Sequence, residues 1–301
     1  MYYKNLLKSV LLLFLCGSCL NQASEKGKWQ SIFNGKDLTG WDTYLGPKYD
    51  TILNRWDTIP IGFNVDPTKV FDVVKMGGEK VIRISGEHFG GMSTLREFEN
   101  YHLQFQFKWG QLRWSPNKKG KKDSGLMYRA VGQQGADGGF WLRSHEFQIE
   151  EGDCGDYWAC AGAISDIKAK MQPDSTYIYN EGGDMLTFSN TSKIGRYCIK
   201  NPDAEKPTGE WNTIDLYCVG NTSVHIVNGV VTMILHNSRQ LDEGKETPLI
   251  KGKIQIESEG SEVFYRNMQI KFIDKLPDFS STHSGKSSAV EGRSQPERMA
   301  F

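Results

Sequence analysis

The stretch His102-Leu-Gln-Phe-Gln-Phe-Lys-Trp109 alternates apolar and polar residues without a break, and this pattern indicates the fold class. Successive side chains of a β-strand point to opposite faces, so the leucine, both phenylalanines and the tryptophan share one face. One face of this strand is therefore predicted to be buried and the other to be polar. Strands of this kind are typical of antiparallel sheets that pack together by one side.

The same alternation recurs along the chain, and almost no helical pattern accompanies it. It is seen in the segments 214–218, 254–256 and 268–272, and the segment 81–85 is a further predicted strand, ended by Gly86. Asn228-Gly229 separates two further apolar runs and predicts a two-residue hairpin turn. The 32 glycines suit a protein built from strands and tight turns. We therefore predict an all-β protein, a jelly-roll sandwich of two antiparallel sheets.

The first residues have the features of an export signal. Lys4 and Lys8 precede an apolar run that is too short to span a bilayer, and Gly17-Ser-Cys19 follows. Small residues directly before a cysteine resemble the lipobox of bacterial lipoproteins, in which the cysteine is acylated. We predict a lipoprotein signal peptide over residues 1–18 and lipidation at Cys19. Plain secretion after cleavage near Ala23 is the alternative.

The predicted anchor and the composition define the remaining boundaries and the partners. A polar tether over residues 19–28 leads into one domain over 29–275, and a polar tail over 276–301 is predicted to be disordered. Lysine plus arginine and aspartate plus glutamate both number 36, so no basic field attracts nucleic acid. The protein is expected in the periplasm or at the cell surface, attached to a membrane by its lipid.

Four cysteines follow the predicted signal peptide and its lipidated cysteine: Cys154, Cys160, Cys198 and Cys218. Export permits disulfides, and four cysteines allow three pairings. A bond between Cys154 and Cys160 would close a short loop. Cys218 alternates with apolar residues, so a buried free thiol is as compatible with the sequence there. The pairing stays open.

The segment Ser144-His-Glu-Phe-Gln-Ile-Glu-Glu-Gly-Asp153 carries the main candidate site. In a strand, Glu146, Gln148 and Glu150 share one face, while the phenylalanine and the isoleucine anchor the other. The α-carbons of the two glutamates would be about 13 Å apart at roughly 3.3 Å per residue. Side chains that lean together could still approach the carboxyl separations of glycosidases. The row is either a ligand-binding surface or the solvated side of a strand.

Two neighbouring segments supply further candidates. Asp123-Ser-Gly-Leu-Met-Tyr-Arg129 places opposite charges at the ends of a short strand, and arginine is suited to bidentate contacts with carboxylates or sugar hydroxyls. An edge salt bridge after a turn is the alternative. Trp158 could stack on a sugar ring or fill the core. Glu151, Asp153 and Asp156 supply oxygen ligands for Ca²⁺, but their spacing is not that of an EF-hand, and no cofactor is predicted.

Other catalytic motifs are missing from the sequence. It has no Gly-x-Ser-x-Gly elbow, no His-Glu-x-x-His pair and no phosphate-binding glycine loop. The six histidines are scattered without ligand-like spacing. These observations argue against a triad hydrolase and against a zinc enzyme.

Several segments, in order along the chain, together resemble the DUF1080 family, described as 3-keto-disaccharide hydrolases or 3-keto-glucoside lyase/hydratases. The likeness covers about Trp29 to Ile273. Its segments are Phe33-Asn-Gly-Lys-Asp-Leu-Thr-Gly-Trp41, Gly91-Met-Ser-Thr-Leu-Arg-Glu-Phe98, Asp123-Ser-Gly125 leading to Arg129, Glu146-Phe-Gln-Ile149, Gly209-Glu-Trp-Asn212, Val227-Asn-Gly229 and Phe264-Tyr-Arg-Asn267.

The resemblance implies a concanavalin A-like jelly roll that cleaves glycosides already oxidised at C3 of the sugar. A 3-keto group makes the C2 proton acidic, so a base can remove it while the aglycone leaves from C1; water adds later. From strand geometry, we predict that Glu146 and Glu150 transfer protons and that Gln148 holds a hydroxyl. Arg129 is expected near the developing enolate. Asp123, Tyr128 and Trp158 are expected to complete the carbohydrate-binding surface.

Two alternatives remain. The Glu-Phe-Gln-Ile-Glu strand is also similar to the Glu-x-Asp-x-Glu strand of laminarinase-type glucanases, which are retaining hydrolases of the same fold. Gln148 replaces the middle aspartate of that pattern, which argues against ordinary retaining hydrolysis. The other alternative is a surface carbohydrate-binding module without turnover, which would present a flat aromatic platform in place of carboxylates.

Overall fold

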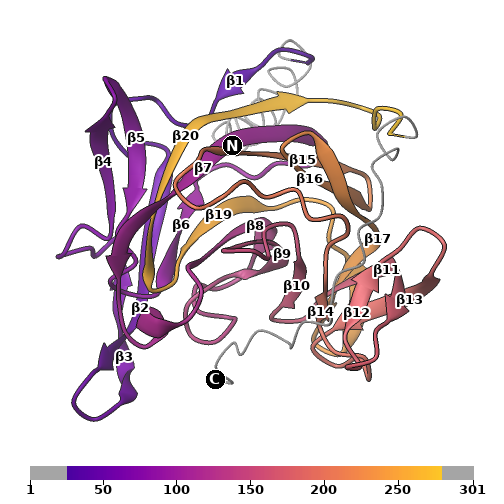
Figure 1. Ribbon diagram of the computed structural model, residues 1–301, viewed down its shortest axis with the longest axis horizontal. Coiled ribbons are helices and arrows are strands. Elements are labelled where there is room, and N and C mark those ends of the chain that lie inside the picture. The colour runs from indigo at the N-terminus through magenta and orange to yellow at the C-terminus, as the bar shows by residue number, and fades with distance from the viewer. Residues whose placement is uncertain (1–25, 280–301) are drawn as a thin grey trace, which may run out of the picture.

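The computed structural model describes residues 26–279 of the 301-residue chain (Figure 1). The predicted signal peptide, the lipidation site Cys19 and residues 280–301 of the predicted tail lie outside this part. Within it, the regular structure consists of strands and one 3-10 turn, η1 (Asn117–Lys119). No helix of the described part is long and apolar enough to cross a bilayer.

The strands form two sheets. In spatial order, sheet A contains β12 (Tyr177–Tyr179), β11 (Ala163–Met171), β17 (Val230–Asp242), β16 (Thr222–Val227), β15 (Asn212–Val219), β7 (Tyr101–Arg113), β20 (Ser261–Phe272), β5 (Glu79–Ile84) and β4 (Phe71–Met76). Three short strands pair beside this path: β1 (Gln30–Ser31) with β20, β13 (Asp184–Ser189) with β11, and β18 (Lys245–Pro248) with β17. Sheet B contains β14 (Tyr197–Cys198), β10 (Tyr157–Cys160), β9 (Arg143–Glu150), β8 (Asp123–Val131), β19 (Lys253–Ser258), β6 (Gly90–Thr94), β2 (Trp41–Asp50) and β3 (Arg55–Phe63).

The two sheets pack face to face, and Figure 1 shows sheet A arching over sheet B. Neighbouring strands pair antiparallel, and many neighbours are distant in the sequence: β19 lies between β8 and β6, and β20 lies beside β7. Such long-range neighbours are typical of a jelly roll. The structure therefore confirms the predicted all-β sandwich of two antiparallel sheets.

The alternating stretch that defined the fold class lies within β7. Its four apolar side chains, Leu103, Phe105, Phe107 and Trp109, are at most 2% exposed and belong to the main core between the sheets. The predicted hairpin joins β16 to β17, and Asn228 and Gly229 have φ values of 50° and 81°. Positive φ at both positions is what a two-residue turn of this type requires. Both predictions are confirmed.

The face of each strand in sheet B follows from the same core. Phe147 and Ile149 of β9 and Leu126 of β8 pack in the main core. Because side chains alternate, Glu146 and Gln148 lie on the opposite face, which is turned away from sheet A. We call this the free face of sheet B. The side chains of the predicted row on β9 lie on this face.

The cysteines of the described part form no disulfide bonds, and the end of this part packs against sheet A. Cys154, Cys160, Cys198 and Cys218 are all buried free thiols, so no disulfide forms among them. Leu276 and Phe279, which the sequence assigns to the tail, pack against a small apolar cluster on sheet A.

Candidate active site

The free face of sheet B carries acidic and amide side chains on three adjacent strands. In the register of the sheet, Gln148 of β9 lies opposite Gly125 of β8, and Asp123 of β8 lies opposite Glu259, just beyond β19. Met127 of β8 has neighbours on both sides, Glu146 and Gln255. The predicted row on β9 is therefore one edge of a wider polar surface. We call this surface the polar field; its residues are Asp123, Glu146, Gln148, Glu150, Gln255, Glu257 and Glu259.

Glu146 and Glu257 converge above Gly125. A β-carbon added to Gly125 would lie 2.8 Å from Glu146 Oε1 and 2.4 Å from Glu257 Oε2, so both oxygens are within 3.0 Å of one point. Both glutamates are 0% exposed. Two carboxyl groups this close and this buried favour sharing a proton over carrying two charges. The absence of a side chain at Gly125 makes this approach possible.

Glu146 lies at the border between the polar field and an aromatic cluster. Cys160 of β10 donates a hydrogen bond to Glu146 Oε2 at 3.5 Å, and Trp158 lies opposite Glu146 in the register. The Trp158 ring contacts Tyr197 and is covered by the Arg196 guanidinium, 5.3 Å from the ring centroid. The buried cluster on this side contains Phe89, Met127, Phe140, Trp141, Trp158, Cys160, Tyr197 and Ile199.

Gln148 and Glu150 each present a buried polar atom to the free face. Gln148 Nε2 and Glu150 Oε2 have no hydrogen-bond partner among the described residues, although their residues are only 1% and 7% exposed. The other end of the Gln148 amide accepts the Ile149 backbone N–H at 3.0 Å. Buried polar atoms without a partner are costly, and ligand binding is one way to satisfy them.

Glu150 shares a proton with Asp153, which follows in the turn after β9. Burial, followed by the charge of Asp153, raises the pKa of Glu150 to about 8. Burial acts on Asp153 in the same direction, but its bond to Lys121 and the charge of Lys200 overcome it, so the pKa of Asp153 is lowered. At neutral pH, Glu150 is therefore a neutral acid beside an ionised Asp153. Two nearby carboxyls with separated pKa values are a common arrangement for acid and base roles.

The raised pKa values predict how stability depends on pH. Glu150 and Glu205, whose pKa burial raises to about 7, hold protons in the folded protein that the unfolded chain releases above about 4.5. This contribution is complete below pH 4.5 and is lost as the pH rises through about 7 and 8. We expect urea unfolding to give a lower free energy at about pH 9 than at about pH 5. Glu150→Gln should reduce this difference, and an unchanged difference would contradict the prediction.

The structure places two predicted binding residues elsewhere. The Tyr128 hydroxyl bonds to Ser223 and His225 of sheet A, both at 3.0 Å, so this side chain lies between the sheets. Arg129 donates to the carbonyls of Gly220 and Thr222 at 2.8 and 3.1 Å. Neither residue lies in the polar field, so the prediction that Tyr128 and Arg129 belong to the site is wrong.

A β-bulge explains the displacement of Arg129. Strict alternation would put Arg129 on the free face with Gly125 and Met127. The register between β8 and β9 shifts after Tyr128, and Arg129 has a φ of 52°. A bulge of this kind re-aims a side chain, here into the interior. The remaining predicted residues, Asp123, Glu146, Gln148, Glu150 and Trp158, do lie on the free face.

The sequence interpretation missed the contribution of β19. Ile254 and Ile256 were assigned to a strand, which already implied that Gln255 and Glu257 share its other face. Only the pairing of β19 with β8 brings that face beside Glu146. Gln255 is held there by bonds to Ser93, Gln134 and the Leu142 backbone N–H.

The three carboxylates considered for Ca²⁺ have separate partners. Glu151 accepts from Thr208, Asp153 from Lys121, and Asp156 from Tyr197 and the Lys200 backbone N–H. Within residues 26–279, no group of three or more histidine, cysteine, aspartate or glutamate side chains has an arrangement that could hold a metal ion.

Fold and site together define a jelly-roll protein with a carboxylate- and amide-lined face, a class suited to polyhydroxylated ligands. The chain belongs to the family of 3-keto-alpha-glucoside-1,2-lyase-like domains, which matches residues 28–271. This match confirms the resemblance found in the sequence and places the chain in a family of carbohydrate-active enzymes. Among curated proteins, none matches the sequence.

Solved structures to which this chain is similar include two proteins of Parabacteroides distasonis ATCC 8503, each provisionally described as a glycosyl hydrolase. The first is 17% identical, covers 82% of this chain and 100% of its own, and has a TM-score of 0.46. The second is 18% identical over 84% of this chain and 97% of its own, with a TM-score of 0.44. The carbohydrate-binding module CBM66 of Bacillus subtilis is 7% identical over 66% and 90% of the two chains, with a TM-score of 0.38.

Proposed function

We propose that this protein cleaves glycosides that carry a ketone at C3, by removing the C2 proton and eliminating the aglycone from C1. The observation that carries the proposal is the convergence of Glu146 and Glu257 above Gly125, on a face that also presents the neutral Glu150. Membership of the 3-keto-alpha-glucoside-1,2-lyase-like family supports the choice of substrate.

The elimination requires two proton transfers, and addition of water follows it. The Glu146–Glu257 pair, in its singly protonated form, takes the C2 proton, and the electrons of the C2–H bond form the C1=C2 double bond. The bond between C1 and the glycosidic oxygen breaks, and Glu150 gives its proton to that oxygen. Addition of water across the double bond then places hydroxyl at C1 and hydrogen at C2. General acid and base groups of this kind contribute roughly 10²- to 10⁴-fold each.

Gln148 is suited to stabilise the charge that develops on the sugar. Its Nε2 is buried and has an unused hydrogen-bonding capacity on the same face as Glu146 and Glu150. A fixed N–H donor that meets an enolate oxygen lowers the barrier more than the same donor in water. An aspartate at this position, as in the laminarinase-type pattern, would repel that charge, which is why elimination fits these residues better than retaining hydrolysis.

The proposed location follows from the N-terminal sequence. Lipidation at Cys19 would hold the domain at a membrane in the periplasm or at the cell surface, where it would meet carbohydrate from outside the cytoplasm. This placement stands on the lipobox-like Gly17-Ser-Cys19 and the apolar run before it.

Incubation with a glucoside and with its 3-keto form in D₂O tests the reaction. We expect cleavage of the keto form alone, with deuterium at C2 of the released sugar as read by mass spectrometry and NMR. Because elimination removes the C2 proton, hydration in D₂O must replace it with deuterium. Cleavage of the plain glucoside without C2 exchange would overturn the proposal in favour of a retaining hydrolase. Saturable binding without cleavage of either compound would overturn it in favour of a binding module.

A further inference from the structure

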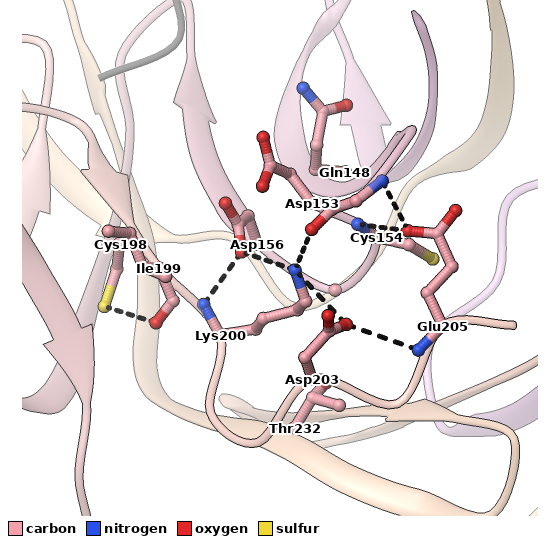
Figure 2. A network of polar contacts seen from close by, with 12 residues as sticks. Gln148, Asp153, Cys154, Asp156, Cys198, Ile199, Lys200, Asp203, Glu205 and Thr232 are labelled. Carbon is pink, nitrogen blue, oxygen red and sulfur yellow. Dashed lines mark hydrogen bonds and ion pairs between the residues drawn. The ribbon is translucent and has the colours of Figure 1, made fainter. Parts of the chain in front are cut away.

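A cluster of charged residues lies beneath the turn that joins β9 to β10. This turn carries Asp153, the partner of Glu150, and Figure 2 shows it between Lys200 on one side and Glu205 on another. The turn closes through its own backbone, because Asp153 N–H donates to Glu150 at 2.8 Å and Gly155 N–H donates to Gln148 at 2.9 Å. Its conformation is therefore tied directly to the two site residues of β9.

Lys200 holds the turn from inside the protein. The residue is 3% exposed, and its Nζ donates to the Gly152 carbonyl at 2.8 Å. The same nitrogen is 3.7 Å from one oxygen of Asp156 and 3.7 Å from one oxygen of Asp203. A buried ammonium needs paired charges and hydrogen bonds of this kind to remain charged.

Glu205 holds the opposite side of the turn. Its Oε2 accepts the backbone N–H groups of Gly152 and Cys154 at 2.8 and 3.4 Å. Gly152 is thus bound through its carbonyl by Lys200 and through its N–H by Glu205. These contacts fix the backbone on either side of Asp153.

Five ionisable groups from different elements act on the Glu150–Asp153 pair. Lys121, before β8, bonds to Asp153, and the charge of Lys200 favours the ionised form of Asp153. Glu259, after β19, adds negative charge near Glu150. The other two groups, Asp156 in the turn and Tyr197 of β14, bond to each other and interact electrostatically with Asp153. Lys200 is the most deeply buried cation of this set.

We propose that Lys200 is a positioning residue for the reaction, which anchors the turn through Gly152 and keeps the negative charge on Asp153 so that the proton of the pair stays on Glu150. This inference rests on the proposed function, in which Glu150 supplies the proton to the leaving oxygen. Lys200 Nζ contacts Gly152, Asp156 and Asp203, and Lys200 acts on the reaction through Asp153.

The test compares Lys200→Gln with the wild type. The glutamine amide can still donate to the Gly152 carbonyl but carries no charge, so it separates the charge from the hydrogen bond. The pKa of Asp153 should rise, so that at neutral pH part of the proton of the pair moves from Glu150 to Asp153 and kcat falls, with KM nearly unchanged. A rise of one pKa unit at Asp153 alone changes the ratio of the two singly protonated forms about tenfold toward the form in which Asp153 holds the proton. Lys200→Arg should restore most of the activity, because it keeps the charge.

Carboxyl ¹³C NMR titration of Asp153 provides a readout that does not depend on turnover. An Asp153 that titrates at the same pH in Lys200→Gln as in the wild type would overturn the inference, whatever the activity. If Lys200→Gln fails to fold, the Asp153 titration is measured in two other variants. Lys200→Arg keeps the positive charge, so Asp153 should titrate as in the wild type. Asp203→Asn removes the negative charge beside Lys200, so the pKa of Asp153 should change, and an unchanged pKa would contradict the inference. Lys170→Met, an exposed position on β11, is the matched control and should titrate as the wild type. Failure of the wild type to cleave any 3-keto-glucoside would count against the proposed function alone.

Discussion

Replacing Glu146 by glutamine is expected to lower kcat/KM for a 3-keto-glucoside by about 10²- to 10⁴-fold, because the amide cannot accept the C2 proton. Glu257→Gln should cause a loss of the same order, since both carboxyl groups lie within 3.0 Å of the same point above Gly125. The double variant should lose little more than either single variant, because residues that act as a unit are not additive. Steady-state kinetics with a chromogenic 3-keto-glucoside measures all three.

Glu97→Gln is a suitable control for these variants. Its side chain is 47% exposed and pairs with Lys251 on the surface, and it has no role in the proposed reaction. The control should retain wild-type kcat/KM, and circular dichroism should show that each variant keeps the sandwich fold. Normal turnover by both Glu146→Gln and Glu257→Gln would show that this face is not the active site.

Introducing a single methyl group with Gly125→Ala is expected to lower activity by roughly 100-fold, the order of loss caused by a misplacement of about 1 Å. The new β-carbon would lie 2.4 Å from Glu257 and 2.8 Å from Glu146, so the two carboxyls must move apart. The backbone of Gly125 lies in β8 and has no positive φ, so alanine adds no backbone strain there. Stability should fall by about 1–3 kcal/mol, as for other overpacked sites.

Gly120→Ala provides the matched control for this substitution. A β-carbon at Gly120 would meet only the Asn117 carbonyl oxygen at 3.6 Å, which is an ordinary contact. Activity and urea unfolding of Gly120→Ala should stay close to the wild type. Full activity of Gly125→Ala would mean that the approach of Glu146 and Glu257 is not needed for the reaction.

The fold was predictable because its signals are local. Alternation in the segment 102–109 identified a half-buried strand, and Asn228-Gly229 identified a hairpin by its need for positive φ. The same rule placed Glu146, Gln148 and Glu150 on one face, which the core position of Phe147 confirms. These properties depend only on which side chains alternate and on which residues tolerate a left-handed backbone.

The rule failed where the backbone departs from regular geometry. Arg129 was predicted at the site because an unbroken strand would carry it there. The bulge after Tyr128 turns it to the interior instead, where it bonds to the carbonyls of Gly220 and Thr222. A bulge depends on how two strands pair, and one strand's sequence carries no clear sign of it.

The strand faces, the sandwich class and the row of polar residues on β9 can be predicted from the sequence alone, because each of these follows from a period of two along a single strand. The chemistry of the row depends on contacts that the folded protein makes between strands. The tertiary structure placed Glu257 beside Glu146 through the pairing of β19 with β8, more than a hundred positions apart in the chain. It also set Lys200 beneath the turn of Asp153. Contacts and pKa values of this kind arise from distances between segments that only folding brings together.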